Sequence, residues 1–189
     1  MVARRYALLL FLLLASVASP ARADNYSDAL KTFRGAGQSS KFFGTSYGYA
    51  LFPTIGRGGF GIGGAHGSGR VYADGAQVGN TSMNQVTVGF QLGGQAYSQI
   101  IFFEDKRAFE DFTSGNFEFG AQAGAVAITA SASAEATSGG SGASASSSKS
   151  NAKTSGGYQK GMAVFTVAKG GLMYEASIGG QKFGYKAIK

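Results

Sequence analysis

Residues 57–72 have the sequence RGGFGIGGAHGSGRVY, in which every odd position from Gly59 to Gly69 is glycine or alanine. In an extended strand successive side chains point to opposite faces, so one face of this strand would be nearly free of side chains. A helix would distribute the glycines around its circumference, at a cost of roughly 0.5–1 kcal/mol each relative to alanine. The pattern therefore predicts a strand against which another segment lies closely, or a strand that bends sharply. The glycines to which we assign this structural role are Gly59, Gly61, Gly63, Gly64, Gly67 and Gly69.

The first 23 residues have the features of a secretory signal peptide. Arg4 and Arg5 precede an apolar run, and Ala21-Arg22-Ala23 supplies an A-x-A cleavage motif. The run is shorter than the roughly 20 apolar residues that span a bilayer. We expect cleavage between Ala23 and Asp24, a single domain over residues 24–189, and a periplasmic or secreted location.

Composition narrows the classes of partner. The chain has no cysteine, which excludes disulfides and a lipidated cysteine as an anchor. It has 17 basic and 10 acidic residues, and loss of Arg4, Arg5 and Arg22 with the signal peptide would leave 14 against 10, or +4. This mild excess fits attraction to anionic lipid. Nucleic acid is not expected as a partner, because the chain is predicted to be exported and has neither a basic cluster nor a known nucleic-acid-binding motif.

Two short helices are predicted. In residues 24–34, apolar side chains recur at i, i+3, i+4 and i+7, which predicts an amphipathic helix ended by Gly35. We expect its apolar stripe to cover a sheet, and a membrane-surface helix is the alternative. The second helix spans residues 106–112, after the capping pair Glu104-Asp105.

The rest of the chain is typical of short strands. A first strand over residues 46–52 is expected to end at Pro53, and residues 85–92 alternate apolar with polar side chains. Residues 117–128 predict one strand with a bulge near Gly124, where the apolar phase reverses. Together the segments predict an α+β fold dominated by β structure, with a strongly curved or barrel-like antiparallel sheet. The Ser/Ala/Gly-rich segment 138–155 predicts a flexible loop within the domain.

No motif indicates an enzyme, a cofactor or a metal. Gly59-x-Gly61-x-x-Gly64 matches the dinucleotide fingerprint in letters, but neither the preceding apolar strand nor the following helix is present. His66 is the only histidine and has no carboxylate at ligand spacing, so we interpret it as a strand residue bonded to its neighbours. General-base use of His66 is the alternative. We therefore expect a protein that is not an enzyme.

Basic side chains are the candidates for binding. If several of them meet on one rim of the sheet, each would contribute roughly 1 kcal/mol near a charged membrane. The alternative is that they are scattered, solvated charges. The candidates for lipid binding are Lys41, Arg57, Arg70, Lys106, Arg107, Lys169 and Lys182.

Four segments in order resemble the SYLF domain family. They are Tyr47-Gly48-Tyr49-Ala50-Leu51-Phe52-Pro53, GGFGIGGAHGSG (58–69), VGFQLGGQAYSQIIFF (88–103) and KGGLMYEASIGGQKFGYK (169–186). The resemblance implies binding of phosphoinositide or other acidic phospholipid and, in the eukaryotic branch, regulation of actin. An exported chain would meet neither actin nor phosphoinositides in a bacterium, so only lipid binding in general terms is carried over. The resemblance implies no catalytic residues.

The leading hypothesis is an exported protein that binds anionic phospholipid at a periplasmic membrane face. Basic residues on the sheet rim would attract headgroups, and exposed aromatic side chains would enter the interface. The alternative is a structural or assembly module of the envelope, in which a protein partner lies along the glycine-rich strand.

Overall fold

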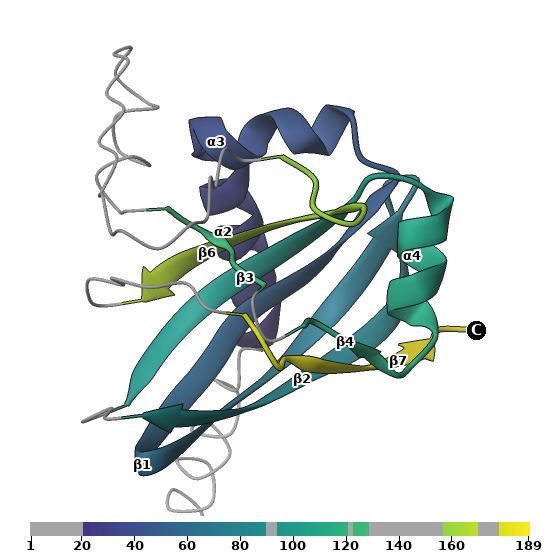
Figure 1. The fold of residues 1–189 in the computed structure, drawn as a ribbon. Coiled ribbons are helices and arrows are strands. Elements are labelled where there is room, and N and C mark those ends of the chain that lie inside the picture. Colours follow the sequence, from purple (N-terminus) through teal and green to yellow (C-terminus); the bar gives the residue numbers. More distant parts are fainter. Residues whose placement is uncertain (1–20, 90–93, 121–122, 129–156, 170–177) are drawn as a thin grey trace, which may run out of the picture.

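The structure, a computed structural model, describes residues 21–89, 94–120, 123–128, 157–169 and 178–189. Within these residues it forms a seven-stranded sheet in the order β4-β7-β2-β1-β3-β6-β5 (Figure 1). Most of the predicted signal peptide and the whole predicted loop 138–155 lie outside the described residues.

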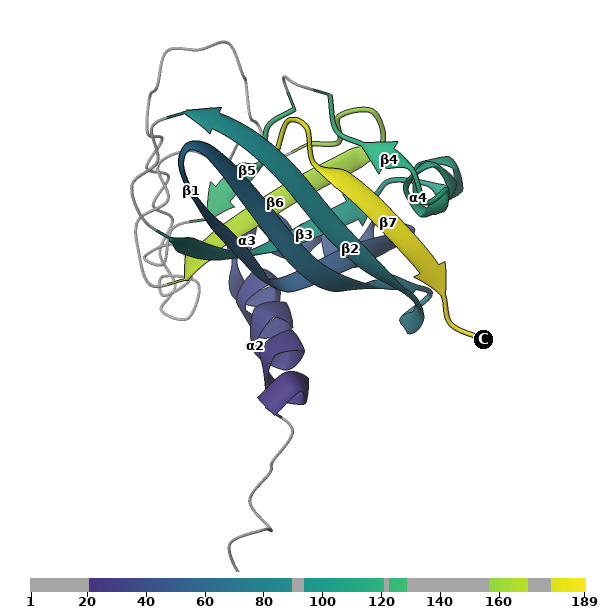
Figure 2. The same ribbon diagram turned by 90° about the horizontal axis from the view of Figure 1, so that it is seen from below.

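The sheet curls into a half-barrel, with helices packed against it (Figure 2). Its paired strands are antiparallel except β5, which runs parallel to β6. The predicted β-dominated α+β fold with a strongly curved sheet is therefore confirmed. The strands are β1 (Gly48–Ala73), β2 (Ala76–Gly89), β3 (Gln95–Phe103), β4 (Phe117–Glu118), β5 (Val126–Ile128), β6 (Met162–Lys169) and β7 (Lys182–Ala187). The helices are α2 (Ala21–Gly35), α3 (Gly37–Ser40), the 3-10 helix η2 (Lys41–Gly44) and α4 (Lys106–Thr113).

The glycine-rich segment is the second half of β1, and this strand doubles back on itself (Figures 1 and 2). Residues 48–57 pair with β3, whereas residues 61–73 pair with β2. Gly59 lies between the two halves and has a φ of 154°, a backbone conformation that side chains rarely permit. The bend therefore depends on glycine at this position.

The two halves of β1 lie against each other at close range. A Cβ atom on Gly67 would lie 2.6 Å from Ile55 Cγ1, and one on Gly69 would lie 2.8 Å from the Leu51 carbonyl oxygen. The same approach brings Gly48 against the Tyr72 carbonyl oxygen. The prediction that a segment lies on the side-chain-free face is confirmed, and that segment is the first half of the same strand.

Pro53 does not end the first strand, so this prediction is wrong. The pairing of β1 with β3 shifts register between Phe52 and Ile55, and Pro53 lies within this irregularity. Proline has no N–H to donate to a ladder, and a bulge is one of the few places where a sheet accommodates it. The Ser98 hydroxyl donates a hydrogen bond to the Pro53 carbonyl oxygen over 2.7 Å, which fixes the bulge to the neighbouring strand.

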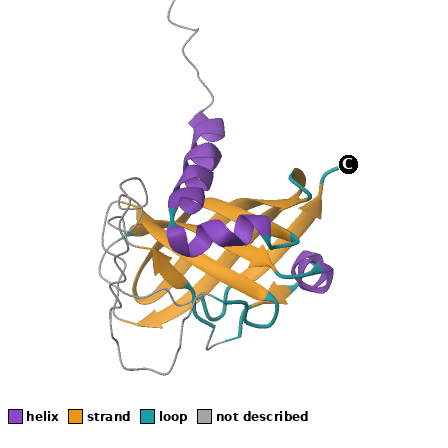
Figure 3. Ribbon diagram, turned by 90° about the horizontal axis from the view of Figure 1, so that it is seen from above, coloured by secondary structure: helices purple, strands orange, loops and turns teal. Residues whose placement is uncertain are grey.

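Each face of the curled sheet has its own apolar core. Figure 3 shows the N-terminal helices lying over one face of the sheet. The convex face is covered by α2, α3 and η2, and Phe33 of α2 is completely buried there. The apolar stripe of the predicted N-terminal helix therefore packs on the sheet. On the concave face, Phe112 of α4 packs against Phe103 and Phe183. The Asp105 carboxylate accepts a hydrogen bond from the Ala108 N–H over 2.8 Å, which confirms the predicted cap.

In the second part of β2, the polar side chain of Gln85 points into the concave core. Gln85 is buried, and its Nε2 donates to the Gly179 carbonyl oxygen over 2.9 Å. Gln99 Nε2 donates to Gln181 Oε1 over 2.9 Å, and Gln181 Nε2 lies 3.3 Å from the Tyr97 hydroxyl. Burial raises the pKa of Tyr97 to about 12. A buried polar network thus occupies part of the half-barrel.

Residues 117–128 form two strands at opposite edges of the sheet, so the prediction of one bulged strand is wrong. β4 pairs with β7, and β5 pairs with β6. The Ala123 N–H donates to the Gly120 carbonyl oxygen over 2.9 Å, which makes a turn where the bulge was expected. Ala123 and Ala125 pack against the concave core. This connection therefore crosses the concave face from one edge to the other.

The close contact inside β1 predicts a position-dependent cost of adding one methyl group. Gly67→Ala should lower the free energy of unfolding by about 1–3 kcal/mol, because the new Cβ overlaps Ile55. Gly56→Ala in the same strand meets nothing within 4 Å and serves as the matched control. Chemical denaturation of both variants measures the difference. Equal stability of the two would contradict the close contact.

The buried glutamine network gives a second stability prediction. Gln181→Leu should cost about 1–3 kcal/mol, because the polar groups of Gln99 and Tyr97 would lose a buried partner. Gln95→Leu in β3 is the control, since Gln95 is exposed. Urea unfolding followed by circular dichroism reports both values, and a change below about 0.5 kcal/mol at Gln181 would show that the network adds nothing.

Candidate functional site

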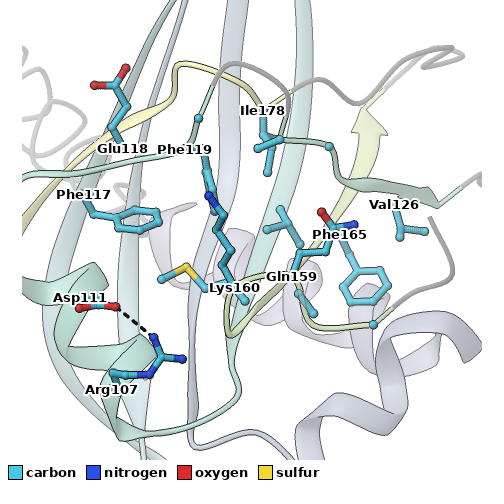
Figure 4. Close-up of a pocket in the computed structure, with 17 residues that line it drawn as sticks. Arg107, Asp111, Phe117, Glu118, Phe119, Val126, Gln159, Lys160, Phe165 and Ile178 are labelled. Atoms are coloured by element: carbon cyan, nitrogen blue, oxygen red, sulfur yellow. Dashed lines mark ion pairs between the residues drawn. The ribbon is translucent and has the colours of Figure 1, made fainter. Parts of the chain in front are cut away.

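A cavity of about 690 Å³ opens between α4, the β4–β5 connection and the start of β6 (Figure 4). Its volume lies within the roughly 300–1,000 Å³ that is typical of small-molecule sites. Residues from five separate stretches of the chain line it, because the β4–β5 connection passes over the concave core at this point. The fold, rather than one local motif, builds the site.

The walls of the cavity are mainly apolar. Phe117 and Phe119 stand on one side, with ring centroids 5.0 Å apart in an edge-to-face arrangement. Met162, Val164 and Ile178 line it as well, and all three belong to the concave core. The cavity is therefore an extension of the apolar core that reaches the surface.

Charged side chains surround this apolar interior (Figure 4). Arg107 Nη1 lies 3.7 Å from Asp111 Oδ2, and Lys182 Nζ lies 3.4 Å from Glu118 Oε2. Both acidic residues that line the cavity are thus paired with cations. Within the described part of the chain, Lys160 lines the cavity without an ion pair.

Lys160 occupies a strained position. It has a φ of 51° and is followed by Gly161 with a φ of 78°, so two left-handed residues in succession form the turn between Gln159 and Met162. The left-handed conformation costs a lysine about 1–2 kcal/mol, and such turns favour asparagine or glycine. A Cβ on Gly161 would lie 3.0 Å from Ala108 Cβ, so the turn is packed against α4. In the view of Figure 4 the Lys160 side chain extends across the cavity.

The structure does not bring the seven candidate cations together on one rim. Lys106 and Arg107 lie on α4, where Lys106 pairs with Glu110 over 3.5 Å, and only Arg107 lines the cavity. Arg57 and Lys169 lie beside the start of β3, because Arg57 pairs with Gln95 and Lys169 with Ala96.

The remaining candidates lie on the convex side or the far part of the sheet. The Lys41 ammonium lies 5.3 Å from the centroid of the Phe42 ring, and the Arg70 guanidinium lies 4.0 Å from that of Tyr26. Lys182 on β7 is held by Glu118. These contacts anchor the cations locally rather than directing them to a common site.

The glycine-rich flank and His66, two further candidate features, have local structural roles. The side-chain-free flank at Gly67 and Gly69 is occupied by residues 51–55 of the same strand, so no partner segment can lie there. His66 Nδ1 lies 2.8 Å from Asn84 Oδ1 on the neighbouring strand. This contact agrees with the prediction that His66 is a strand residue bonded to its neighbours. Among the described residues, no three histidine, aspartate or glutamate side chains gather closely enough to hold a metal ion.

Sequence reasoning missed the residues that define the cavity. Lys160-Gly161 directly before a strand is a local signal for a tight turn, but nothing in the sequence places that turn beside α4. Phe117 and Phe119 stand two residues apart, as on one face of a strand, but their role as a wall depends on the crossing of the β4–β5 connection. No helix in the described part of the chain has the length and apolar character to cross a bilayer.

These features define a class: a half-barrel domain whose apolar core opens through a cavity bordered by charge. The sequence matches the family described as "Ysc84: Las17-binding protein actin regulator" over residues 84–184, or 101 of 189 residues. The chain therefore belongs to the Ysc84 family, also called SYLF, a family associated with lipid binding and generally non-catalytic. The resemblance found in the sequence is confirmed.

A more distant likeness is to "Beta cell expansion factor A" of Aeromonas veronii. The two sequences are 27% identical over 92 residues, which is 49% of this chain. The match covers 28% of the Aeromonas protein, so that protein is much longer than the region it shares with this chain.

Proposed function

We propose that this domain binds an anionic phospholipid, with an acyl chain in the cavity and the phosphate at Lys160. The observation that carries the proposal is one cation without an ion pair beside an apolar cavity of about 690 Å³. The family's association with lipid binding supports it. The proposed setting is a periplasmic membrane face, as the signal-peptide features of the sequence suggest.

The apolar walls provide affinity without headgroup preference. Phe117, Phe119 and Ile178 present hydrocarbon to the cavity, and each buried methylene of an acyl chain contributes about 0.8 kcal/mol. A ligand that fills this space must therefore carry a long apolar part. Polar metabolites of the same volume would leave their hydrogen-bonding groups unpaired against these walls.

The charges around the cavity provide the preference for an anion. Asp111 and Glu118 are neutralised by Arg107 and Lys182, which leaves the Lys160 ammonium for the ligand. A lysine is a flexible point charge suited to a phosphate. Arg107, beside the same turn, is held by both Asp105 and Asp111 over 3.7 Å, so it can add hydrogen bonds to that phosphate only by loosening one of these contacts.

Short-chain lipids that stay monomeric in water test the site without a membrane. Dihexanoyl-phosphatidylglycerol should bind about tenfold more tightly than dihexanoyl-phosphatidylcholine, because only the former carries net negative charge for Lys160. Lys160→Ala should weaken binding of the phosphatidylglycerol more than that of the phosphatidylcholine, whose phosphate charge is already balanced by choline, and so reduce the preference. Isothermal titration calorimetry measures all four affinities.

Lys31→Ala is the matched control, since Lys31 is an exposed lysine on α2 and does not line the cavity. It should retain the preference for phosphatidylglycerol. Equal affinity of the natural protein for both lipids, or an unchanged preference in Lys160→Ala, would overturn the proposed role of this lysine. Absence of binding to either lipid would overturn the cavity as a lipid site.

A further inference from the structure

Two large aliphatic side chains face solvent at the end of the sheet where β1 bends. Ile62 is 71% exposed and Val86 is 76% exposed, whereas the preceding Gln85 is buried. A strand with one solvated face normally buries its valines and exposes its glutamines. The second part of β2 does the reverse, so hydrocarbon is presented outward where the sheet could have presented amide groups.

The register places both side chains on one face. Gly64 pairs with Val86, and Ile62 occupies the next position of the same parity along β1. Directly opposed residues of antiparallel strands share a face, and so do residues two apart in one strand. Ile62 and Val86 are therefore diagonal neighbours on the convex face. We call this pair the apolar tip.

Cations follow the apolar tip along the same face. Lys182 pairs with Asn84, which lies two residues before Val86 in β2. At roughly 3.4 Å per residue, Lys182 is therefore displaced from Val86 by about 7 Å along the strand direction. Asn80 pairs with both Arg70 and Lys186, which places these two residues two rows further on, where Arg70 is held against the Tyr26 ring of α2. Lys182 and Lys186 are exposed, although Lys182 contacts Glu118 of β4.

The three strands that carry this face contain no acidic residue. β1, β2 and β7 together supply Arg57, Arg70, Lys182, Lys186 and His66, and neither aspartate nor glutamate occurs in any of them. Glu118 of β4, opposite Lys182, is an acidic neighbour of this face. A surface that combines exposed aliphatic side chains at its end with the lysines of β7 behind them complements an anionic bilayer. Hydrocarbon enters the acyl boundary, and the cations meet the headgroups.

We infer that the apolar tip inserts into the interface of an anionic lipid bilayer, with the exposed Lys182 and Lys186 on the headgroup side. The inference rests on the proposed function in taking phospholipid as the partner, but it assigns a surface separate from the cavity. None of these residues lines the cavity. The tip would hold the domain at the membrane, while the cavity would take up a single lipid.

Tryptophan placed in the tip reports insertion directly, because the natural sequence contains none. Ile62→Trp and Val86→Trp should each shift their emission to the blue with vesicles of phosphatidylcholine and phosphatidylglycerol in equal parts. Doxyl groups on the acyl chains should quench both. Ile188→Trp is the matched control: Ile188 is also an exposed aliphatic residue, at 45%, and lies outside the tip. Its emission should stay unshifted and unquenched.

Removal of the aliphatic groups gives the complementary measurement. The double variant Ile62→Ser/Val86→Ser should partition into the same vesicles about tenfold more weakly or worse, because two side chains no longer leave water. Ile188→Ser should partition like the natural protein, and added salt should weaken binding of both. Sedimentation with vesicles measures the bound fraction, and circular dichroism establishes that each variant is folded.

Three outcomes overturn the inference: unshifted emission from position 62 or 86 in vesicle-bound protein, equal partitioning of the double variant, or no sedimentation of the natural protein with anionic vesicles. The short-chain lipid titration separates this inference from the proposed function. Uptake of monomeric lipid without insertion of the tip refutes the tip alone. Insertion of the tip without uptake of monomeric lipid refutes the cavity as a lipid site and leaves the tip supported.

Discussion

The close approach of the two halves of β1 is the contact on which the rest of the structure depends. Gly67 and Gly69 have no side chains, so residues 51–55 can lie directly against them, and Gly59 provides the bend that brings the halves together. The first half of β1 then pairs with β3, and its second half pairs with β2. A bulkier residue at these positions would separate the halves and flatten the curl that encloses the concave core.

The arrangement of polar and apolar side chains in β2 links the fold to the proposed activity. Inside, Gln85, Gln99 and Gln181 bond to one another or to the backbone, so their burial is compensated by hydrogen bonds. Outside, Val86 faces water without compensation. The interior tolerates polar groups because they form a network, whereas burial within the described part of the domain does not account for the exposed valine, which is the feature that the proposed membrane contact would explain.

Local patterns were enough to predict much of the fold. The glycine alternation indicated a strand in close contact, the apolar stripe of residues 24–34 indicated a helix on the sheet, and Asp105 was recognised as a cap. The errors at Pro53 and near Gly124 have one cause: a proline or a phase reversal does not reveal whether a strand bulges, ends or changes partner. The cavity was not predictable, because it forms only where α4, the β4–β5 connection and the Lys160 turn meet.

The β4–β5 connection crosses from one edge of the sheet to the other and so supplies the outermost strand at both edges. β4 has two residues and β5 has three, so each outermost strand of the described sheet is very short. A long outermost strand exposes a row of unpaired amides and carbonyls that recruits strands from other molecules. On the β4 side, where residues 119–120 are described and lie outside the strand, that row is brief, which disfavours pairing of another copy along this edge. A protein with outward-facing hydrocarbon thus keeps a safeguard against fibrous self-association.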